Sequence, residues 1–300
     1  MQNNQIAKKL APQKPFRPAV LKKWYKWFPG CVQMGYLSCN EVSMIRSPYF
    51  QKSLLIQMEL LHCDNDDQDN VLRIYADGQV GVVFYTGDQR VTFNGRVCAP
   101  LFAYGQTLKP LEIRSGGKFS LLVAYLQPIA LHAYFALKAS ELTDNCLDFK
   151  HIDRHLTTRL IVADSWQKRQ ELLTNYLLNI DSEGYYKTDT RIHEAAAEII
   201  TRSGSVRPGE LYRRLSMTER TFERQFLKHV GITSAAYCRV CRFKSALQLL
   251  HNPGAVDLPG VAYHSGYADQ SHFIRNFKEF TAVTPTQFLS KRANAALYGL

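Results

Sequence analysis

The sequence predicts an α+β protein, with a β-rich barrel or sandwich and following helices in its first part and an all-helical unit of seven helices at its C-terminus. Length and composition support two domains, because 300 residues with 46% hydrophobic side chains can bury two cores. Short apolar runs separated by turn residues fill the first half of the chain. Near the C-terminus the motif Phe-x-Arg-x-Phe starts at Phe222 and again at Phe273, 51 residues later, which indicates a repeated helical unit.

Residues 1–30 form a basic segment that contains several prolines. Because these prolines alternate with lysines, we expect an extended tail rather than a helix or a strand. The aromatic residues at positions 24–28 are too many for a purely disordered segment, so part of this tail is expected to dock on the body of the protein.

A β-rich segment follows, and we assign the first domain to residues 31–182. Its apolar runs are rich in β-branched and aromatic residues and are separated by turns such as Asn94-Gly95. The predicted strands are Leu54–Leu61, Val71–Tyr75, Val80–Tyr85, Val91–Phe93, Leu101–Tyr104, Leu111–Arg114 and Phe119–Leu126. Short strands at this spacing predict a barrel or a sandwich. Helices are predicted after them at Ile129–Leu137 and Asp164–Asn179.

The second copy of the repeated motif has the pattern of a helix-turn-helix. Val261–Ser265 is predicted as a short helix, which ends at Gly266 because glycine readily adopts a left-handed backbone conformation. Asp269 can then accept hydrogen bonds from the free N–H groups of a second helix over about residues 269–280. Phe273 stands four residues before the next phenylalanine, so both belong to the buried face of that helix.

The first copy repeats this pattern with a turn that is one residue shorter. Glu210–Leu215 is predicted as the short helix, Ser216 takes the place of the glycine, and Thr218 caps a helix over about residues 218–229. The faces of the two long helices that carry no phenylalanine are expected to be open to solvent or to a ligand. The candidate binding residues on these helices are Thr218, Arg220, Thr221, Glu223, Arg224 and Lys228 in the first copy, and Gln270, Ser271, His272, Ile274, Arg275 and Lys278 in the second.

These two stretches, closed by Val283-Thr284-Pro285, resemble the paired helix-turn-helix domain of AraC-type transcription regulators. The resemblance covers roughly the last third of the chain, and we assign the domain to residues 188–292. It implies a seven-helix domain whose two recognition helices bind adjacent major-groove segments of double-stranded DNA. Its first helix is expected at about Arg191–Ser203. Tyr212 and Ile274 depart from the family pattern, which bears on base preference more than on fold.

The β-rich segment resembles, more loosely, the cupin-like sensor domain that often precedes such helix-turn-helix pairs in bacteria. The similar residues are Ala76-Asp77-Gly78 before an apolar strand, Gly105-Gln106, and Pro110-Leu111-Glu112-Ile113. The resemblance implies control by a signal such as a small-molecule effector, which the sequence does not identify, and it implies no enzymatic activity. It also implies RNA polymerase and a second copy of the chain as partners.

The net charge of +11 is unevenly distributed. Residues 1–40 contribute +7, residues 41–187 contribute −2 and residues 188–300 contribute +6. The C-terminal part therefore carries the basic excess expected of a surface that binds phosphates. If the charge were the only observation, a solvated basic surface with no binding partner would be the better interpretation. The paired helix-turn-helix motif instead favours a surface that binds phosphates.

No catalytic, metal-binding or cofactor-binding site is predicted from the sequence. His151 and His155 stand four residues apart without a third ligand, so a surface position is the better interpretation. Cys238 and Cys241 fall inside a predicted helix with no second pair, which favours packing over zinc or redox chemistry. The odd cysteine count of 7 favours reduced thiols in a cytoplasmic protein. No apolar run reaches the length of a membrane span.

Two alternatives remain beside a DNA-binding regulator whose β-rich domain senses a signal. In one, the same DNA-binding module carries a β-rich domain that only dimerises or docks a partner. In the other, a β-barrel binds a small molecule or catalyses a reaction, and the helical tail is structural. Arg224 and Arg275 on the exposed sides of both motifs argue against the last alternative, because a structural bundle has no need of paired arginines there. We therefore predict a regulator and not an enzyme.

Overall fold

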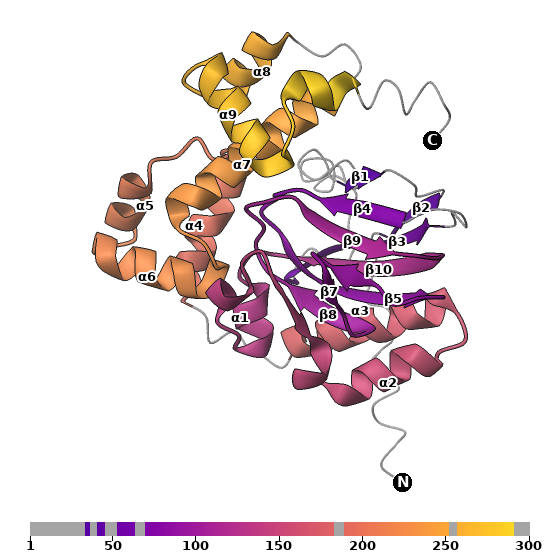
Figure 1. Cartoon of the computed structure of the whole chain (residues 1–300). Helices are drawn as coiled ribbons and strands as arrows, with labels where there is room; N and C mark the ends of the chain where they lie inside the picture. Colours follow the sequence, from indigo (N-terminus) through magenta and orange to yellow (C-terminus); the bar gives the residue numbers. More distant parts are fainter. Residues whose placement is uncertain are drawn as a thin grey trace, which may run out of the picture.

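A computed structural model of the chain describes residues 34–36, 41–45, 53–63, 70–182, 189–251 and 257–290. The predicted tail and the boundary between the two predicted domains lie outside these residues. Within them a two-layered β-structure is followed by helices, so the predicted α+β class is confirmed (Figure 1).

The β-rich part consists of two antiparallel sheets rather than a closed barrel. The five-stranded sheet has the order β1 (Met34–Tyr36), β4 (Asn70–Ile74), β9 (Leu111–Ser115), β6 (Thr92–Phe93) and β7 (Arg96–Val97). The six-stranded sheet has the order β11 (Cys146–Asp148), β8 (Leu101–Tyr104), β5 (Val80–Gly87), β10 (Phe119–Leu126), β3 (Leu55–Cys63) and β2 (Glu41–Ile45). Every strand predicted from an apolar run is present, and the structure adds the short strands β1, β2, β7 and β11.

Strand β10 lies in the middle of the six-stranded sheet and is apolar on both faces. Its register places Leu122 between Leu60 of β3 and Phe84 of β5. Leu121 and Val123 point into the core between the two sheets, whereas Leu122 belongs to the core on the other face, under the helices. A strand covered on both faces reads as a continuous apolar run, which is what the sequence shows here.

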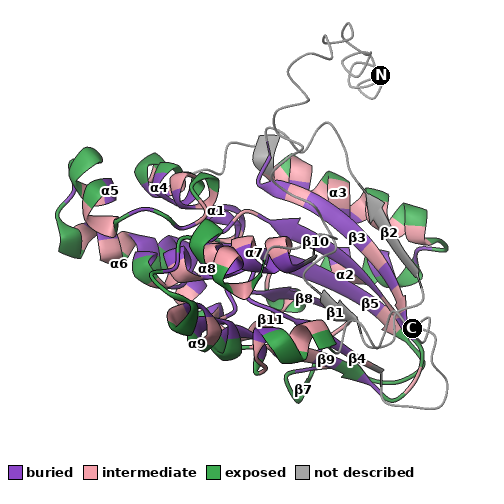
Figure 2. Cartoon of the chain, turned by 90° about the horizontal axis from the view of Figure 1, so that it is seen from above, coloured by how far each residue is buried: buried purple, intermediate pink, exposed green. Residues whose placement is uncertain are grey.

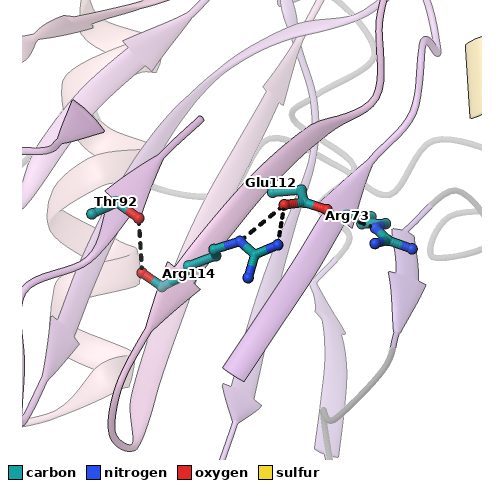
Figure 3. Close-up of polar contacts among 4 residues, drawn as sticks. All are labelled: Arg73, Thr92, Glu112 and Arg114. Atoms are coloured by element: carbon teal, nitrogen blue, oxygen red, sulfur yellow. Dashed lines mark hydrogen bonds and ion pairs between the residues drawn. The ribbon is translucent and has the colours of Figure 1, made fainter. Parts of the chain in front are cut away.

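The outward face of the five-stranded sheet carries ion pairs instead of an apolar layer (Figure 3). Glu112 accepts hydrogen bonds from Arg114 at 2.5 Å and from Arg73 at 2.9 Å, and Arg73 is its direct cross-strand partner. The Arg114 guanidinium, and after it that of Arg73, lowers the pKa of the Glu112 carboxyl. These arginines are therefore already paired within the sheet.

Three helices follow the strands, namely α1 (Ala130–Phe135), α2 (Arg154–Val162) and α3 (Trp166–Ser182). The Trp166 ring lies edge-on to Phe84 at 6.0 Å, so α3 covers the outer face of the six-stranded sheet (Figures 1 and 2). The sequence predicted α1 and α3 but not α2. Only Leu156 and Leu160 of α2 are buried, and its exposed Ile161 and Val162 break the helical pattern of apolar positions.

The C-terminal part is helical throughout its described residues. Its helices are α4 (Thr190–Thr201), α5 (Pro208–Arg214), α6 (Glu219–Val230), α7 (Ser234–His251), α8 (Leu258–His264) and α9 (Gln270–Thr281), and residues 285–290 are helical as well. The predicted succession of seven helices is confirmed. Ile192, Ala196 and Ile199 of α4 are buried, as the first predicted helix requires.

The helical part shares one continuous apolar core with the sheet and with α1–α3. Polar and ring contacts join the two parts directly, and three of them lie at or next to α6 and α7. The Tyr237 hydroxyl on α7 donates to the Gly78 carbonyl at 3.0 Å, and the Thr143 hydroxyl donates to the Gly231 carbonyl at 2.7 Å. His132 of α1 stacks on His229 of α6 with ring centroids 4.3 Å apart. The β-rich part therefore holds the first helix-turn-helix directly.

The cysteines correct one expectation. Cys98, Cys146, Cys238 and Cys241 are free thiols, whereas Cys63 is disulfide-bonded, so the expectation of reduced cysteines throughout is wrong at Cys63. Cys238 and Cys241 are buried in α7, which agrees with a packing role. Among the described residues, no helix has both the length and the apolar character needed to span a membrane.

Candidate nucleic-acid interface

The first helix-turn-helix consists of α5, a short turn and α6. Ser216 in the turn has a φ of 52°, the left-handed conformation that glycine provides in the second copy. The Thr218 hydroxyl accepts from the Thr221 backbone N–H at 3.3 Å and caps α6, as predicted. Phe222 and Phe226 are fully buried, and the ring of Tyr212 packs against Phe222. Tyr212 of α5 therefore packs against the buried face of α6.

The second helix-turn-helix consists of α8, a turn at Gly266 and α9. Asp269 accepts from the His272 backbone N–H at 2.7 Å and caps α9, as predicted. Gly266 has a φ of 75°, which favours glycine. The buried Tyr267 hydroxyl donates to the Asn276 side chain at 2.8 Å, and this bond ties the turn to the recognition helix.

The predicted binding residues form an exposed row and a half-buried row on these two helices. The exposed members are Thr218, Arg220, Arg224, Lys228, Gln270, Ser271, Arg275 and Lys278. The half-buried members are Thr221, Glu223, His272 and Ile274. Within the described part of the chain, none of the five cationic side chains in the exposed row forms an ion pair with a carboxylate. They differ in this from the arginines of the five-stranded sheet and remain available to an anionic ligand.

Glu223 does not lie with this exposed row. Its carboxylate accepts from the Ser234 backbone N–H at 3.2 Å and also from the Ser234 hydroxyl. Ser234 is the first residue of α7, so Glu223 satisfies free donors at the N-terminus of that helix. The Glu223 carboxylate is therefore held by α7 and does not stand free beside the exposed cations.

Ile274 occupies the position in α9 that Glu223 occupies in α6. Its side chain is half-buried and packs against the main core. Glu223 and Ile274, which occupy equivalent positions, thus both contact the rest of the protein. Glu223 does so through its carboxylate and Ile274 through an apolar contact.

Helix α7 connects the two helix-turn-helix units and is a single helix of 18 residues, as predicted (Figure 1). Thr233 caps it by accepting from the Ala236 backbone N–H at 3.2 Å. Arg239 of α7 forms an ion pair with Glu279 of α9 and lies over the Phe280 ring. These contacts fix α9 relative to α7.

A close approach also joins the loop after α4 to the turn of the second unit. A Cβ on Gly266 would lie 2.6 Å from the Ser205 hydroxyl oxygen, so a larger residue here would force the Ser205 side chain to move, in addition to taking up an unfavourable backbone conformation. Neither the Ser205 contact nor the Glu223 cap has a local sequence signal, because each partner lies far along the chain. Sequence patterns find residues on one face of one element, and these contacts join different elements.

The potential metal-ligating side chains of the described residues are not grouped as a metal site requires. No group of three His, Cys, Asp or Glu side chains in the described residues could hold a metal ion. His62, for example, has its ring Nδ1 within 2.7 Å of the Ser120 hydroxyl and its ring edge against Trp166.

Two family models match the chain. Residues 211–291 match a family described as "Helix-turn-helix domain", and residues 54–148 match a "Domain of unknown function (DUF6597)". The first match begins within α5 and includes both recognition helices. No curated protein matches the chain.

Several solved structures are similar to the chain at low sequence identity. ToxT from Vibrio cholerae is 11% identical with a TM-score of 0.46, over 78% of this chain and 97% of that chain. Unsaturated fatty acid bound wild-type ToxT from the same organism is 13% identical with a TM-score of 0.41, over 77% and 93%. The C-terminal domain of AraT, a response regulator from Geobacillus stearothermophilus, is 19% identical with a TM-score of 0.31, over 35% and 88%.

The identification rests on the C-terminal sequence match together with the paired motif. Both capped recognition helices, the buried phenylalanine pairs and the single connecting helix lie where the motif predicted them. Residues 211–291 are therefore a helix-turn-helix domain of the AraC type.

Proposed function

We propose that this regulator binds a specific DNA sequence with α6 and α9 in adjacent major-groove segments. The observation that carries the proposal is the set of exposed cations on both helices that form no ion pair with a carboxylate within the described residues, of which Arg224 and Arg275 correspond across the 51-residue offset. A helix in the major groove presents such side chains to base edges and to flanking phosphates. The basic excess of the C-terminal part supplies the electrostatic attraction.

Each exposed residue has a role that follows from its chemistry. Arg224 and Arg275 are proposed to make bidentate contacts to guanine, and Gln270 to contact adenine. Thr218, Ser271, Lys228 and Lys278 are proposed to bind phosphates, together with Arg220, Thr221 and His272. Glu223 is excluded from this set because its carboxylate caps α7. Ile274 contributes only a partial apolar surface, which suits a thymine methyl group if α9 lies deep in the groove.

The β-rich part is proposed to control the DNA-binding part in response to a small-molecule signal. Support comes from the direct contacts of Gly78 with Tyr237 and of Thr143 with Gly231, through which a change in the sheets would reach the first helix-turn-helix. We assign residues 31–182 to this sensor domain and residues 188–292 to the DNA-binding domain. RNA polymerase and a second copy of the chain are the proposed protein partners, and the cytoplasm is the proposed location. Since the family is one of transcription regulators, we propose no catalytic activity.

Selection of bound sequences from a random DNA pool, followed by footprinting, tests this function. Arg224→Ala and Arg275→Ala should each weaken binding to the selected site by roughly 1–3 kcal/mol and relax the preference at one base pair. If either arginine meets only phosphate, the loss should be uniform across sequences with a shallower salt dependence.

Arg154→Ala is the matched control. Arg154 is an exposed arginine on α2, so its loss removes the same charge from a helix that the proposal keeps away from DNA. The proposal fails if both recognition-helix variants bind the selected DNA as tightly as the wild type, or if Arg154→Ala weakens binding by the same amount.

A further inference from the structure

Two thiols meet where the two sheets of the sandwich come together. Cys98 directly follows β7, which is an edge strand of the five-stranded sheet, and Cys146 lies in β11, an edge strand of the six-stranded sheet. Their sulfur atoms are 3.7 Å apart, although 48 residues separate them in the chain. The pair therefore bridges the gap between two sheet edges that no hydrogen-bonded strand pair connects within the described residues.

The backbone on both sides of this contact is held in place. The Cys98 N–H donates to the Val91 carbonyl at 3.0 Å, and the Cys98 carbonyl accepts from the Tyr85 hydroxyl at 2.8 Å. Cys146 is paired with Tyr104 in the antiparallel ladder of β11 and β8. A disulfide needs a sulfur separation of about 2.0 Å. Starting from thiols already in contact, side-chain rotation with a small movement of an edge strand brings the sulfurs together.

The surroundings make Cys146 the more reactive partner. It is half-buried, whereas Cys98 is 8% exposed. The Cys98 and Cys146 sulfurs lie within hydrogen-bond distance, and this contact together with the Arg96 charge lowers the pKa of Cys146, against the effect of its partial burial. Asp148 opposes this effect, but its carboxylate is paired with Lys150 at 2.7 Å. Its greater exposure and its lowered pKa make Cys146 the partner that more readily forms a thiolate, which is the nucleophilic form of cysteine.

The other two free thiols among the described residues, Cys238 and Cys241, provide an internal comparison. Cys238 and Cys241 stand three residues apart on α7 and are 1% and 5% exposed. Burial raises the pKa of Cys238 to about 11 and that of Cys241 to about 12. These two cysteines are therefore protonated and shielded from solvent, in contrast to the half-buried Cys146.

We propose that Cys98 and Cys146 are a peroxide-reactive dithiol that forms a reversible disulfide between the two sheets. The Cys146 thiolate attacks one oxygen of hydrogen peroxide, the O–O bond breaks, and the second oxygen leaves as hydroxide and takes a proton to form water. Cys146 is then a sulfenic acid. The Cys98 sulfur attacks the Cys146 sulfur, its proton is lost, and the sulfenic oxygen leaves as a second water. The two sulfurs together lose two electrons, which reduce the peroxide.

The proposed Cys98–Cys146 disulfide would lie close in sequence to a residue that contacts the first helix-turn-helix. Three residues before Cys146, the Thr143 hydroxyl donates to the Gly231 carbonyl at the end of α6. Between them, the Asp144 carboxylate accepts from the Leu108 backbone N–H at 2.6 Å. A disulfide at Cys146 would restrain this segment, so oxidation acts on the part of the sensor that touches the first helix-turn-helix.

Treatment of the reduced full-length protein with hydrogen peroxide, followed by peptide mapping, tests the proposal. We expect a cross-linked peptide that contains Cys98 and Cys146 and that disappears on reduction with dithiothreitol. Cys98→Ser should instead accumulate a sulfenic acid at Cys146, which dimedone traps, because the resolving thiol is gone. Cys146→Ser should leave Cys98 unmodified at the same peroxide dose.

Cys238→Ser is the matched control and should cross-link Cys98 to Cys146 as fast as the wild type does. A second readout is the melting temperature, which should rise by several degrees on oxidation of the wild type and stay constant in Cys98→Ser. The proposal is overturned if peroxide oxidises other cysteines while Cys98 and Cys146 remain thiols, or if both are oxidised without a bond between them.

Discussion

At the scale of single residues, Glu223 shows why an exposed helix face is not the same as a binding face. Its carboxylate accepts from the Ser234 N–H at 3.2 Å and from the Ser234 hydroxyl, and Ser234 is fully buried. Glu223→Ala should therefore lower the free energy of unfolding by about 1–3 kcal/mol, because it leaves buried donors without an acceptor. Chemical denaturation measures this loss. Glu223→Gln, which keeps one acceptor oxygen, should lose less.

The same variants separate a structural role from base recognition. Glu223→Ala should keep the base preference of the wild type, in contrast to Arg224→Ala. If Glu223→Ala instead changes the preferred base at one position while stability is unaffected, the carboxylate reads DNA and the cap is dispensable.

His229 carries a second residue-scale prediction, on the pH dependence of stability. Its ring is 3% exposed and stacks on His132, and burial first, then the His132 and Lys228 charges, lowers its pKa to about 4, while Asp189 opposes this shift. An unfolded histidine titrates near 6.5. Between these values the unfolded state binds a proton that the folded state does not, so the contribution is complete above about pH 6.5 and is lost as the pH falls toward 4.

Urea denaturation of the wild type and of His229→Phe at several pH values between 4.5 and 7.5 measures this effect. The variant keeps an aromatic ring against His132 but cannot be protonated. We expect the wild type to lose on the order of 1–3 kcal/mol more than the variant over this range. Parallel curves for the two proteins would show that the pKa of His229 is the same in the folded and the unfolded state.

Which of the candidate residues face solvent was largely predictable from helical periodicity. The phenylalanine pairs fix the buried face, and Arg220, Arg224 and Arg275 lie opposite it. Glu223 and Ile274 lie at the edge of that face, where a small helix rotation decides between exposure and contact. Only the neighbouring helix settles their environment, and no pattern within α6 or α9 contains that information.

At the scale of elements, the turns of the two helix-turn-helix units share a left-handed backbone conformation but place different residues in it. Gly266 has a φ of 75° and Ser216 a φ of 52°, and a left-handed backbone costs a residue with a Cβ roughly 1 kcal/mol. Ser216→Gly should therefore change the free energy of unfolding little or raise it by up to about 1 kcal/mol. Gly266→Ala should lower it by about 1–2 kcal/mol or more, since its Cβ would also lie 2.6 Å from the Ser205 oxygen.

Chemical denaturation of both variants gives the comparison, and the opposite direction of the two changes is its internal control. A loss at Ser216→Gly that equals the loss at Gly266→Ala would show that the left-handed conformation is not what limits these turns.

Elements with a local periodic signal were predictable and those held by tertiary contacts were not. Strand β10 and helix α7 have long apolar or helix-forming runs and appear where the sequence placed them. Strands β7 and β11 have two and three residues and exist because a neighbouring strand pairs with them. Pairing partners distant in sequence leave no periodicity in so short a segment.

At the scale of the whole molecule, the sequence predicted two parts but not how they meet. The Asp77-Gly78 turn of the β-rich part docks on α7, where Tyr237 bonds to Gly78. The buried Asp77 carboxyl has a raised pKa because of burial, and the nearby Lys244 charge opposes that rise. The β-rich part thus contacts α6 through Gly231 and α7 through Tyr237, and it holds the first recognition helix more directly than the second.

The spacing of the two recognition helices leads to the last prediction. Helix α7 has 18 residues and is about 27 Å long. With the half-width of a helix-turn-helix at each end, α6 and α9 lie near the repeat of ~34 Å that separates successive major-groove segments on one side of B-DNA. The ion pair of Arg239 with Glu279 holds α9 on α7 and helps to keep this separation fixed. One chain should therefore protect two short DNA segments about one helical turn apart.

Insertion of base pairs into the selected DNA site measures whether both helices bind at once. About five extra base pairs between the two protected segments turn the second segment to the far side of the duplex, so two-helix binding should be lost and the affinity should fall to that of a single helix-turn-helix. The same insertion outside the protected segments is the control and should leave the affinity unchanged. Equal affinity for both DNAs would mean that only one recognition helix contributes to binding, because a rigid α7 cannot follow a half-turn rotation of its second target.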